Sequence, residues 1–128
     1  MKHLSYFFLQ PLQGFCDHMA ERLEANSHFD CDYAKDGTRE SDTPGWLKDQ
    51  CNFEHLLTKM AEHCGEINGL MRLLINGHGK EKIVVAEDDV VELIKQCADC
   101  ANFAMMIADR AQRRKKEFKQ PLQTFVVE

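Results

Sequence analysis

The sequence predicts an all-α protein in which the helices pack as a bundle. Apolar residues recur at helical spacings of three and four along most of the chain, and no stretch keeps the alternation of a β-strand. A chain of 128 residues normally forms one domain around one hydrophobic core. The 44% share of hydrophobic residues and 29% share of charged ones are typical of a globular chain. We therefore expect a single helical domain over residues 1–128.

The first helix is expected from about Leu12 to Ala25. Pro11 suits the first turn of a helix, and Asn26 suits its end. The apolar positions between them recur every four residues, at Phe15, Met19 and Leu23. Residues 27–45 are then rich in Asp, Gly, Ser, Thr and Pro, which predicts a long loop. Loops of this length in a small domain are usually functional or disordered.

The second helix has the clearest period. Its apolar positions step alternately by four and three residues, the pattern of a helix packed in a bundle. These positions are Phe53, Leu57, Met60, Cys64, Ile67, Met71 and Leu74. The run Asn-Gly-His-Gly at 76–79 is expected to end the helix.

The third helix is expected from Asp88 to about Lys116, followed by a short C-terminal tail at about 117–128. Acidic residues at 87–89 suit the positive end of the helix dipole. One stripe consists mostly of small residues and would allow a close helix approach: Val90, Ile94, Cys97, Ala101, Ala104 and Ala108. A second apolar arc at Phe103, Met106 and Ile107 indicates burial on two sides, so we expect the bundle to be completed by oligomerisation.

The third helix also carries Asp99 and Asn102 one turn apart, within an apolar, Ala-rich stretch. A buried carboxylate costs several kcal/mol unless it is paired or binds a metal. We therefore expect a cation beside Asp99.

Further polar residues align with Asp99. Glu92, Gln96 and Asp99 are spaced i, i+4, i+7 and share one face. If the second and third helices pack antiparallel, Glu66 would face Asp99, with His63 beside it. Carboxylates with access to water suit Mg²⁺. The alternative is that these are the ordinary charges of amphipathic helices, with one satisfied buried Asp.

Several classes of function are disfavoured. The net charge of −5 argues against binding nucleic acid or an anionic membrane, and no segment approaches the ~20 apolar residues of a membrane span. The start of the chain lacks the cleavage site of a signal peptide, so we expect a cytoplasmic protein. The pair Cys97 and Cys100 has no partner pair at zinc-site spacing, which favours reduced thiols. The basic run 113–116 is expected to be a solvated helix end, with phosphate binding as the alternative.

Three segments resemble MazG-type proteins. Residues 62–67, EHCGEI, resemble the helix pattern E-E-V-G-E-L of that family, and residues 97–109, CADCANFAMMIAD, resemble the A-D-V-A-N-F-A-M-M-I-A-D helix of its phage-type members. Residues 19–28, MAERLEANSH, are similar to the segment M-x-x-K-L-x-x-N-R-H, with Trp46 where a G-W follows. The match extends over about residues 15 to 112.

The resemblance implies an all-α nucleoside triphosphate pyrophosphohydrolase that acts as a homodimer or homotetramer. Such an enzyme uses Mg²⁺, with Mn²⁺ as a substitute, to convert a nucleoside triphosphate to the monophosphate and pyrophosphate. The phage-type members imply a purine deoxynucleoside triphosphate, and the cytoplasm of the host for a phage-encoded chain. Two alternatives stay open: a protein that binds nucleotides without turnover, as a sensor or sponge, and a helical protein-interaction module.

The family motifs imply roles for individual residues. Glu62 is the expected general base. The expected metal-binding positions are Glu66, Asp99, Glu92, His63 and Gln96; His63 and Gln96 replace glutamates of the motifs E-x-x-E and E-x-x-D, so the site loses two negative charges. The expected substrate-binding residues are Asn102, Trp46, His28, Asn26, Arg110 and Arg113.

Overall fold

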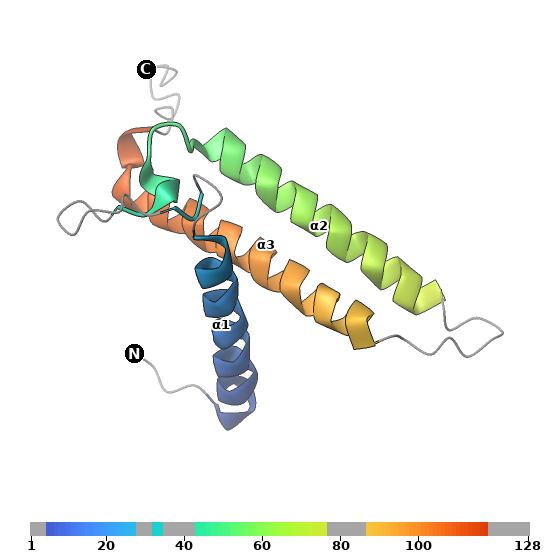
Figure 1. Ribbon diagram of the computed structural model, residues 1–128. Coiled ribbons are helices and arrows are strands. Elements are labelled where there is room, and N and C mark those ends of the chain that lie inside the picture. The colour runs from blue at the N-terminus through green and yellow to red at the C-terminus, as the bar shows by residue number, and fades with distance from the viewer. Residues whose placement is uncertain (1–4, 28–31, 35–42, 77–86, 118–128) are drawn as a thin grey trace, which may run out of the picture.

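The computed structural model describes residues 5–27, 32–34, 43–76 and 87–117. Three long helices make up the fold, α1 (Tyr6–Asn26), α2 (Phe53–Asn76) and α3 (Glu87–Arg113), with the short 3₁₀ helices η1 (Gly45–Leu47) and η2 (Lys115–Glu117). Helices α2 and α3 lie side by side and run in opposite directions, and the C-terminal part of α1 rests on α3 (Figure 1). The predicted all-α bundle is confirmed.

Helix α1 begins six residues earlier than predicted, at Tyr6 rather than Leu12. The Ser5 side chain accepts a hydrogen bond from the Phe7 N–H (3.3 Å) and so provides an N-cap that the sequence reading missed. Pro11 therefore lies inside the helix, where it cannot donate to the carbonyl of Phe7. Phe7 is 86% exposed, so water can reach this turn, and the proline is tolerated there.

The other two helices lie close to their predicted positions. The prediction for α2 is confirmed, because the helix spans Phe53–Asn76. Helix α3 begins at Glu87, one residue before the predicted start, and ends at Arg113, three residues before the predicted end; the chain then continues into η2. The expected loop at 27–45 and tail at 117–128 fall mostly outside the described residues. Among the helices described, none is both long enough and apolar enough to cross a membrane.

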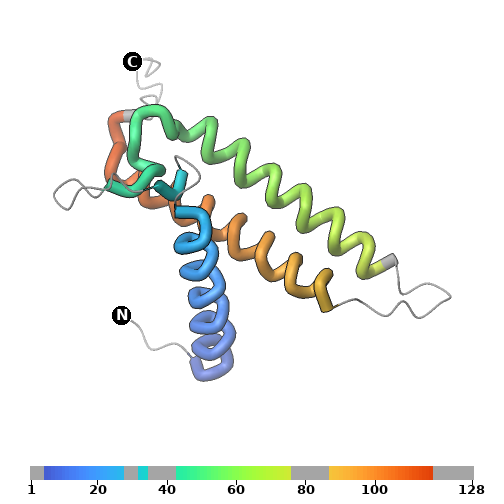
Figure 2. Tube along the Cα trace, viewed as in Figure 1, coloured from blue at the N-terminus to red at the C-terminus, as the bar shows by residue number. Residues whose placement is uncertain are grey.

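The hydrophobic core lies at one end of the helix pair, where η1 and the segment 32–34 approach the start of α2 and the second half of α3 (Figure 2). Its buried members are Tyr33, Cys51, Leu56, Phe103 and Met106. On α2 the predicted seam is correct at Met60, which packs against the core, but Leu56 is buried in place of Leu57, which is 56% exposed. Helix α2 meets α3 on one side only, so most of its seam stays partly exposed.

The buried face of α3 carries polar side chains beside Phe103 and Met106 of the predicted second arc, and it is not the small-residue stripe. Gln96, Asp99, Asn102 and Arg110 are all buried on this helix. The stripe that was expected to allow close packing is at most half-buried, and Val90, Ala104 and Ala108 are exposed. The reason is geometric, because both α1 and α2 contact α3 on the side that bears the polar residues.

Five cysteines of the described segments, Cys16, Cys51, Cys64, Cys97 and Cys100, are free thiols. Cys64 on α2 and Cys100 on α3 lie with their sulfur atoms 3.1 Å apart. Burial, together with the hydrogen bond to Cys64, raises the pKa of Cys100 to about 11. Cys100 is therefore a protonated, poorly nucleophilic thiol at neutral pH.

Candidate functional site

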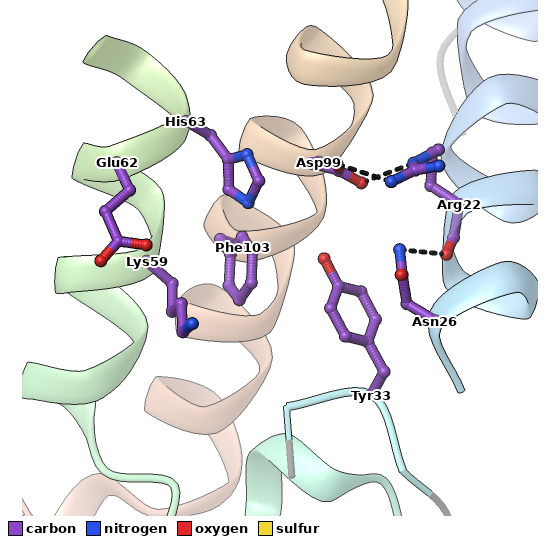
Figure 3. A pocket seen from close by; sticks show the side chains of 8 residues that line it. All are labelled: Arg22, Asn26, Tyr33, Lys59, Glu62, His63, Asp99 and Phe103. Carbon is purple, nitrogen blue, oxygen red and sulfur yellow. Dashed lines mark hydrogen bonds and ion pairs between the residues drawn. The ribbon is translucent and has the colours of Figure 1, made fainter. Parts of the chain in front are cut away.

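A pocket opens where α1, α2 and α3 meet, next to the segment 32–34 (Figure 3). The cavity has a volume of about 250 Å³. Its wall combines two cationic side chains, two carboxylates, an amide and three rings, namely Arg22, Lys59, Glu62, Asp99, Asn26, Tyr33, His63 and Phe103. Cations, carboxylates and aromatic faces in one small cavity are the groups needed to hold an anionic ligand that carries a ring.

Asp99 and Arg22 form a bidentate ion pair on the wall of this pocket. The guanidinium Nε donates to Asp99 Oδ1 at 2.9 Å, and its second nitrogen donates to Oδ2 at 3.0 Å. The hydrogen bond to Asp99 raises the pKa of Arg22, so the guanidinium stays charged. Asp99 is only 3% exposed, and the cation that compensates it in the structure is therefore an arginine from α1.

Sequence reasoning missed Arg22 as a site residue, although a signal was present. Arg22 occupies the cationic position of the segment M-x-x-K-L that residues 19–23 resemble. Lys59 and Tyr33 were also missed. Lys59 lies one turn before Glu62 and His63 on α2, a spacing that places the three on one side of a helix. Tyr33 lies within the expected loop, where no periodic pattern marks it.

A second polar connection joins α2 to α3. His63 Nδ1 lies 2.6 Å from Gln96 Oε1, and Gln96 Nε2 donates to Glu92 Oε1 at 2.8 Å. Because the amide oxygen can only accept, His63 carries its proton on Nδ1. The His63 ring stacks on Phe103 with centroids 5.3 Å apart, and Tyr33 meets the edge of Phe103 at 5.5 Å. His63 and Gln96, both expected as metal-binding residues, thus bind each other.

The predicted metal-binding carboxylates are only partly brought together. Glu62 and Asp99 both line the pocket, and Glu62 is exposed. Glu66 is also exposed, but it does not line the pocket. Because α2 and α3 are antiparallel and His63 meets Gln96, Glu66 and Glu92 lie at the same level one turn away from that contact. In the described part of the chain, no three of these carboxylates have oxygens within 4.8 Å of one another.

Two predicted substrate-binding residues lie at or near the pocket. Asn26 lines it, and its amide nitrogen donates to the Arg22 carbonyl at 3.0 Å. Asn102 is fully buried behind the wall and donates to the Met19 carbonyl of α1 at 3.0 Å. Its amide oxygen is buried and has no hydrogen-bond partner among the described residues. His28 lies outside the described residues.

The other three predicted substrate-binding residues lie at the C-terminal end of α3. Trp46 Nε1 donates to Asp109 Oδ2 at 2.9 Å, and Arg113 donates to the other oxygen of Asp109 at 2.9 Å. These bonds lower the pKa of Asp109, with the Trp46 contact as the main cause. Arg110 donates to the carbonyls of Trp46 (2.6 Å) and Lys48 (2.9 Å). This group fastens η1 to α3 and does not line the three-helix pocket.

No protein-family model, no curated protein and no solved structure matches this chain.

Replacing Arg22 by Met should lower the free energy of unfolding by about 3 kcal/mol, because Asp99 would be left buried without its cation. The double variant Arg22→Met/Asp99→Leu should recover part of this loss, since it removes the orphaned charge. Urea unfolding of the two single variants and the double variant measures the coupling. Additive losses would contradict a functional ion pair between the two side chains.

Replacing Arg110 by Met should lower the free energy of unfolding by about 2–4 kcal/mol, because two carbonyls lose their buried charged donor. Arg113→Met is the matched control. Arg113 is an exposed residue paired i,i+4 with Asp109, so its loss should cost about 0.5 kcal/mol or less. Chemical denaturation compares the two, and equal losses would argue against the structural role of Arg110.

Proposed function

We propose that the chain binds a nucleoside or deoxynucleoside triphosphate in the three-helix pocket and hydrolyses it to the monophosphate and pyrophosphate. The observation that carries this proposal is the bidentate Arg22–Asp99 pair on the wall of a cavity that also contains Lys59, Glu62 and three aromatic rings. The resemblance of residues 62–67 and 97–109 to MazG-type helices supports the same reaction.

Arg22 would be the first group to meet the triphosphate. A guanidinium presents the same forked pair of donors to a phosphate as to a carboxylate. A phosphate group entering the pocket would therefore compete with Asp99 for Arg22, with Lys59 as a second cation nearby. When phosphate takes this position, the Asp99 carboxylate loses its partner and becomes available as an oxygen donor.

The donor chemistry of the two facing helices fits Mg²⁺. Glu62 and Glu66 on α2 and Glu92 on α3 are exposed carboxylates, and Asp99 would join them after releasing Arg22. Mg²⁺ prefers such oxygen ligands and completes its shell with water and phosphate, and Mn²⁺ accepts a similar set. The bound ion would supply charge neutralisation and a water molecule of lowered pKa.

The remaining roles follow from position. Glu62 lies exposed at the pocket and would accept a proton from the attacking water as general base. The rings of Tyr33, His63 and Phe103 offer an aromatic surface for a base. Asn102 is fully buried and does not line the pocket, so it would support the site through its bond to the Met19 carbonyl of α1. A purine deoxynucleoside triphosphate is the substrate we propose.

A second candidate function is nucleotide binding without turnover, as a sensor or sponge. Two observations favour it. Asp99 is already neutralised by Arg22, and His63 and Gln96, which replace two glutamates of the family motifs, are bound to each other. A site with fewer free carboxylates would hold a divalent cation more weakly while still attracting phosphate.

Hydrolysis should be detected as release of pyrophosphate, together with the monophosphate, from a purine deoxynucleoside triphosphate in the presence of Mg²⁺ or Mn²⁺. Glu62→Gln should lower kcat by about 10²-fold or more, because the general base is lost, while the thermal shift caused by the nucleotide persists. The matched control is Glu54→Gln, an exposed glutamate on the same helix that does not line the pocket.

Each outcome of this experiment assigns a function. A nucleotide-dependent thermal shift without pyrophosphate release would favour the binding protein. The absence of both would contradict the two proposals and leave a helical interaction module. An equal fall in kcat in Glu62→Gln and Glu54→Gln would contradict the role of Glu62 as general base.

We also propose that a second copy of the chain covers α1. None of the described residues of α1 is buried, and its start exposes Tyr6, Phe7 and Phe8 at 74%, 86% and 65%. Exposed apolar clusters of this kind mark association surfaces.

Light scattering should therefore give the mass of two or four chains of 14.8 kDa. Phe7→Glu/Phe8→Glu should shift the mass toward one chain, because charged side chains oppose burial of this surface. Gln13→Glu, on the exposed surface of the same helix, should leave the mass unchanged. A wild-type mass of one chain at all concentrations would contradict the proposal.

A further inference from the structure

A separate cluster of metal-type ligands lies where the segment 32–34 meets the start of α2. Asp32 Oδ1 accepts a hydrogen bond from Cys51 Sγ at 3.0 Å and lies 2.5 Å from His55 Nε2. The three ligand atoms lie within 4.8 Å of one another. Asp32 and Cys51 are completely buried, and the His55 side chain is about a third exposed.

The local chain folds so that Cys51 and His55 point to the same place. Asn52 between them caps α2, since its side-chain oxygen accepts from the His55 N–H at 2.9 Å. Cys51 ends the preceding turn, in which its N–H donates to the Lys48 carbonyl at 3.0 Å. The spacing Cys-x-x-x-His therefore straddles a helix start, and Asp32 reaches it from a distant part of the sequence.

The donor set favours zinc over magnesium. A thiolate sulfur, an imidazole nitrogen and a carboxylate oxygen are the usual ligands of Zn²⁺, whereas Mg²⁺ selects oxygen alone. In a tetrahedral zinc site the donor atoms are separated by roughly 3.4–3.6 Å, from the usual zinc–ligand bond lengths. The two observed separations of 3.0 and 2.5 Å are shorter, so the side chains would move apart by about 1 Å or less to admit the ion.

We propose that Asp32, Cys51 and His55 bind one Zn²⁺ ion. Binding replaces the Cys51 thiol proton, which leaves to solvent. It also replaces the proton by which His55 Nε2 bonds Asp32, which passes to solvent or to Nδ1 of the ring. The thiolate and the Asp32 carboxylate then neutralise the dication. Three protein ligands leave the fourth tetrahedral position for a water molecule or another exogenous donor. This site is distinct from the carboxylates of α2 and α3 and does not depend on the hydrolysis proposed above.

The zinc ion would act on the pocket through Tyr33. Tyr33 follows Asp32 directly, packs against Phe103 and lines the three-helix cavity. A zinc ion bound by Asp32, Cys51 and His55 would therefore connect this part of the pocket wall to the start of α2. The proposed role is structural: zinc orders the wall against which a ligand of the pocket packs.

The test uses metal-stripped full-length protein titrated with Zn²⁺, and with Co²⁺ as a spectroscopic probe. Elemental analysis should find one zinc per chain, and the ion should raise the Tm by several degrees. Co²⁺ should produce tetrahedral d–d bands and a thiolate charge-transfer band. Cys51→Ser and His55→Asn should each weaken Zn²⁺ binding at least 100-fold. Cys97→Ser and His18→Asn are the matched controls and should leave binding unchanged.

Three results would overturn the proposal: no bound zinc, a Co²⁺ spectrum of the wild-type protein without a thiolate band, or a band lost in Cys97→Ser rather than in Cys51→Ser. The Co²⁺ spectrum is measured on the wild-type protein, so it tests thiolate binding to the metal even where Cys51→Ser fails to fold. Pyrophosphate release is not used as a readout, and failure of the zinc site therefore leaves the proposed hydrolysis to its own test.

Discussion

The ion pair between Arg22 and Asp99 is the interaction on which the arrangement of the three helices depends. Helix α1 has no buried residue among those described, and its apolar contact with the core is made by the partly buried Leu23. Among the described residues, α1 is bonded to α3 by the two hydrogen bonds from Arg22 to Asp99 and by the bond from Asn102 to the Met19 carbonyl. A buried carboxylate requires a cation, and this requirement fixes where α1 crosses α3.

Helix α3 carries polar side chains that bind residues of α1, α2 and the segment 46–48. Gln96 binds His63 of α2, Asp99 binds Arg22 of α1, and further along Arg110 holds the carbonyls of Trp46 and Lys48. Each of these three side chains of α3 binds a residue that lies far away in the sequence. Arg22, His63 and Asp99 both hold the helices together and line the pocket, so substitutions at these residues affect stability and ligand binding together.

Two kinds of metal chemistry are separated in space. The carboxylates along α2 and α3 are hard oxygen donors with access to water, and Asp32, Cys51 and His55 form a mixed, mostly buried set beside the core. Tyr33 connects the two regions, because it adjoins Asp32 in sequence and lines the pocket. An ion at the mixed site and a ligand in the pocket would therefore both restrain this short segment.

The sequence by itself determined the helices. Helical periodicity and terminal signals located α2 and α3 to within a few residues, because these are local properties of the backbone and its caps. Local reading failed at Pro11, since nothing in the sequence shows that the first turns of α1 remain exposed. It also placed the core side of α3 on the small-residue stripe. In the folded chain the polar side of α3 is buried instead. Residues 22, 63 and 19 on the other two helices supply hydrogen-bond partners for Asp99, Gln96 and Asn102 respectively, and these partners allow the three side chains to be buried. The apolar stretch around Asp99 thus indicated that this carboxylate needs a cation, and only the tertiary structure showed that the cation is Arg22.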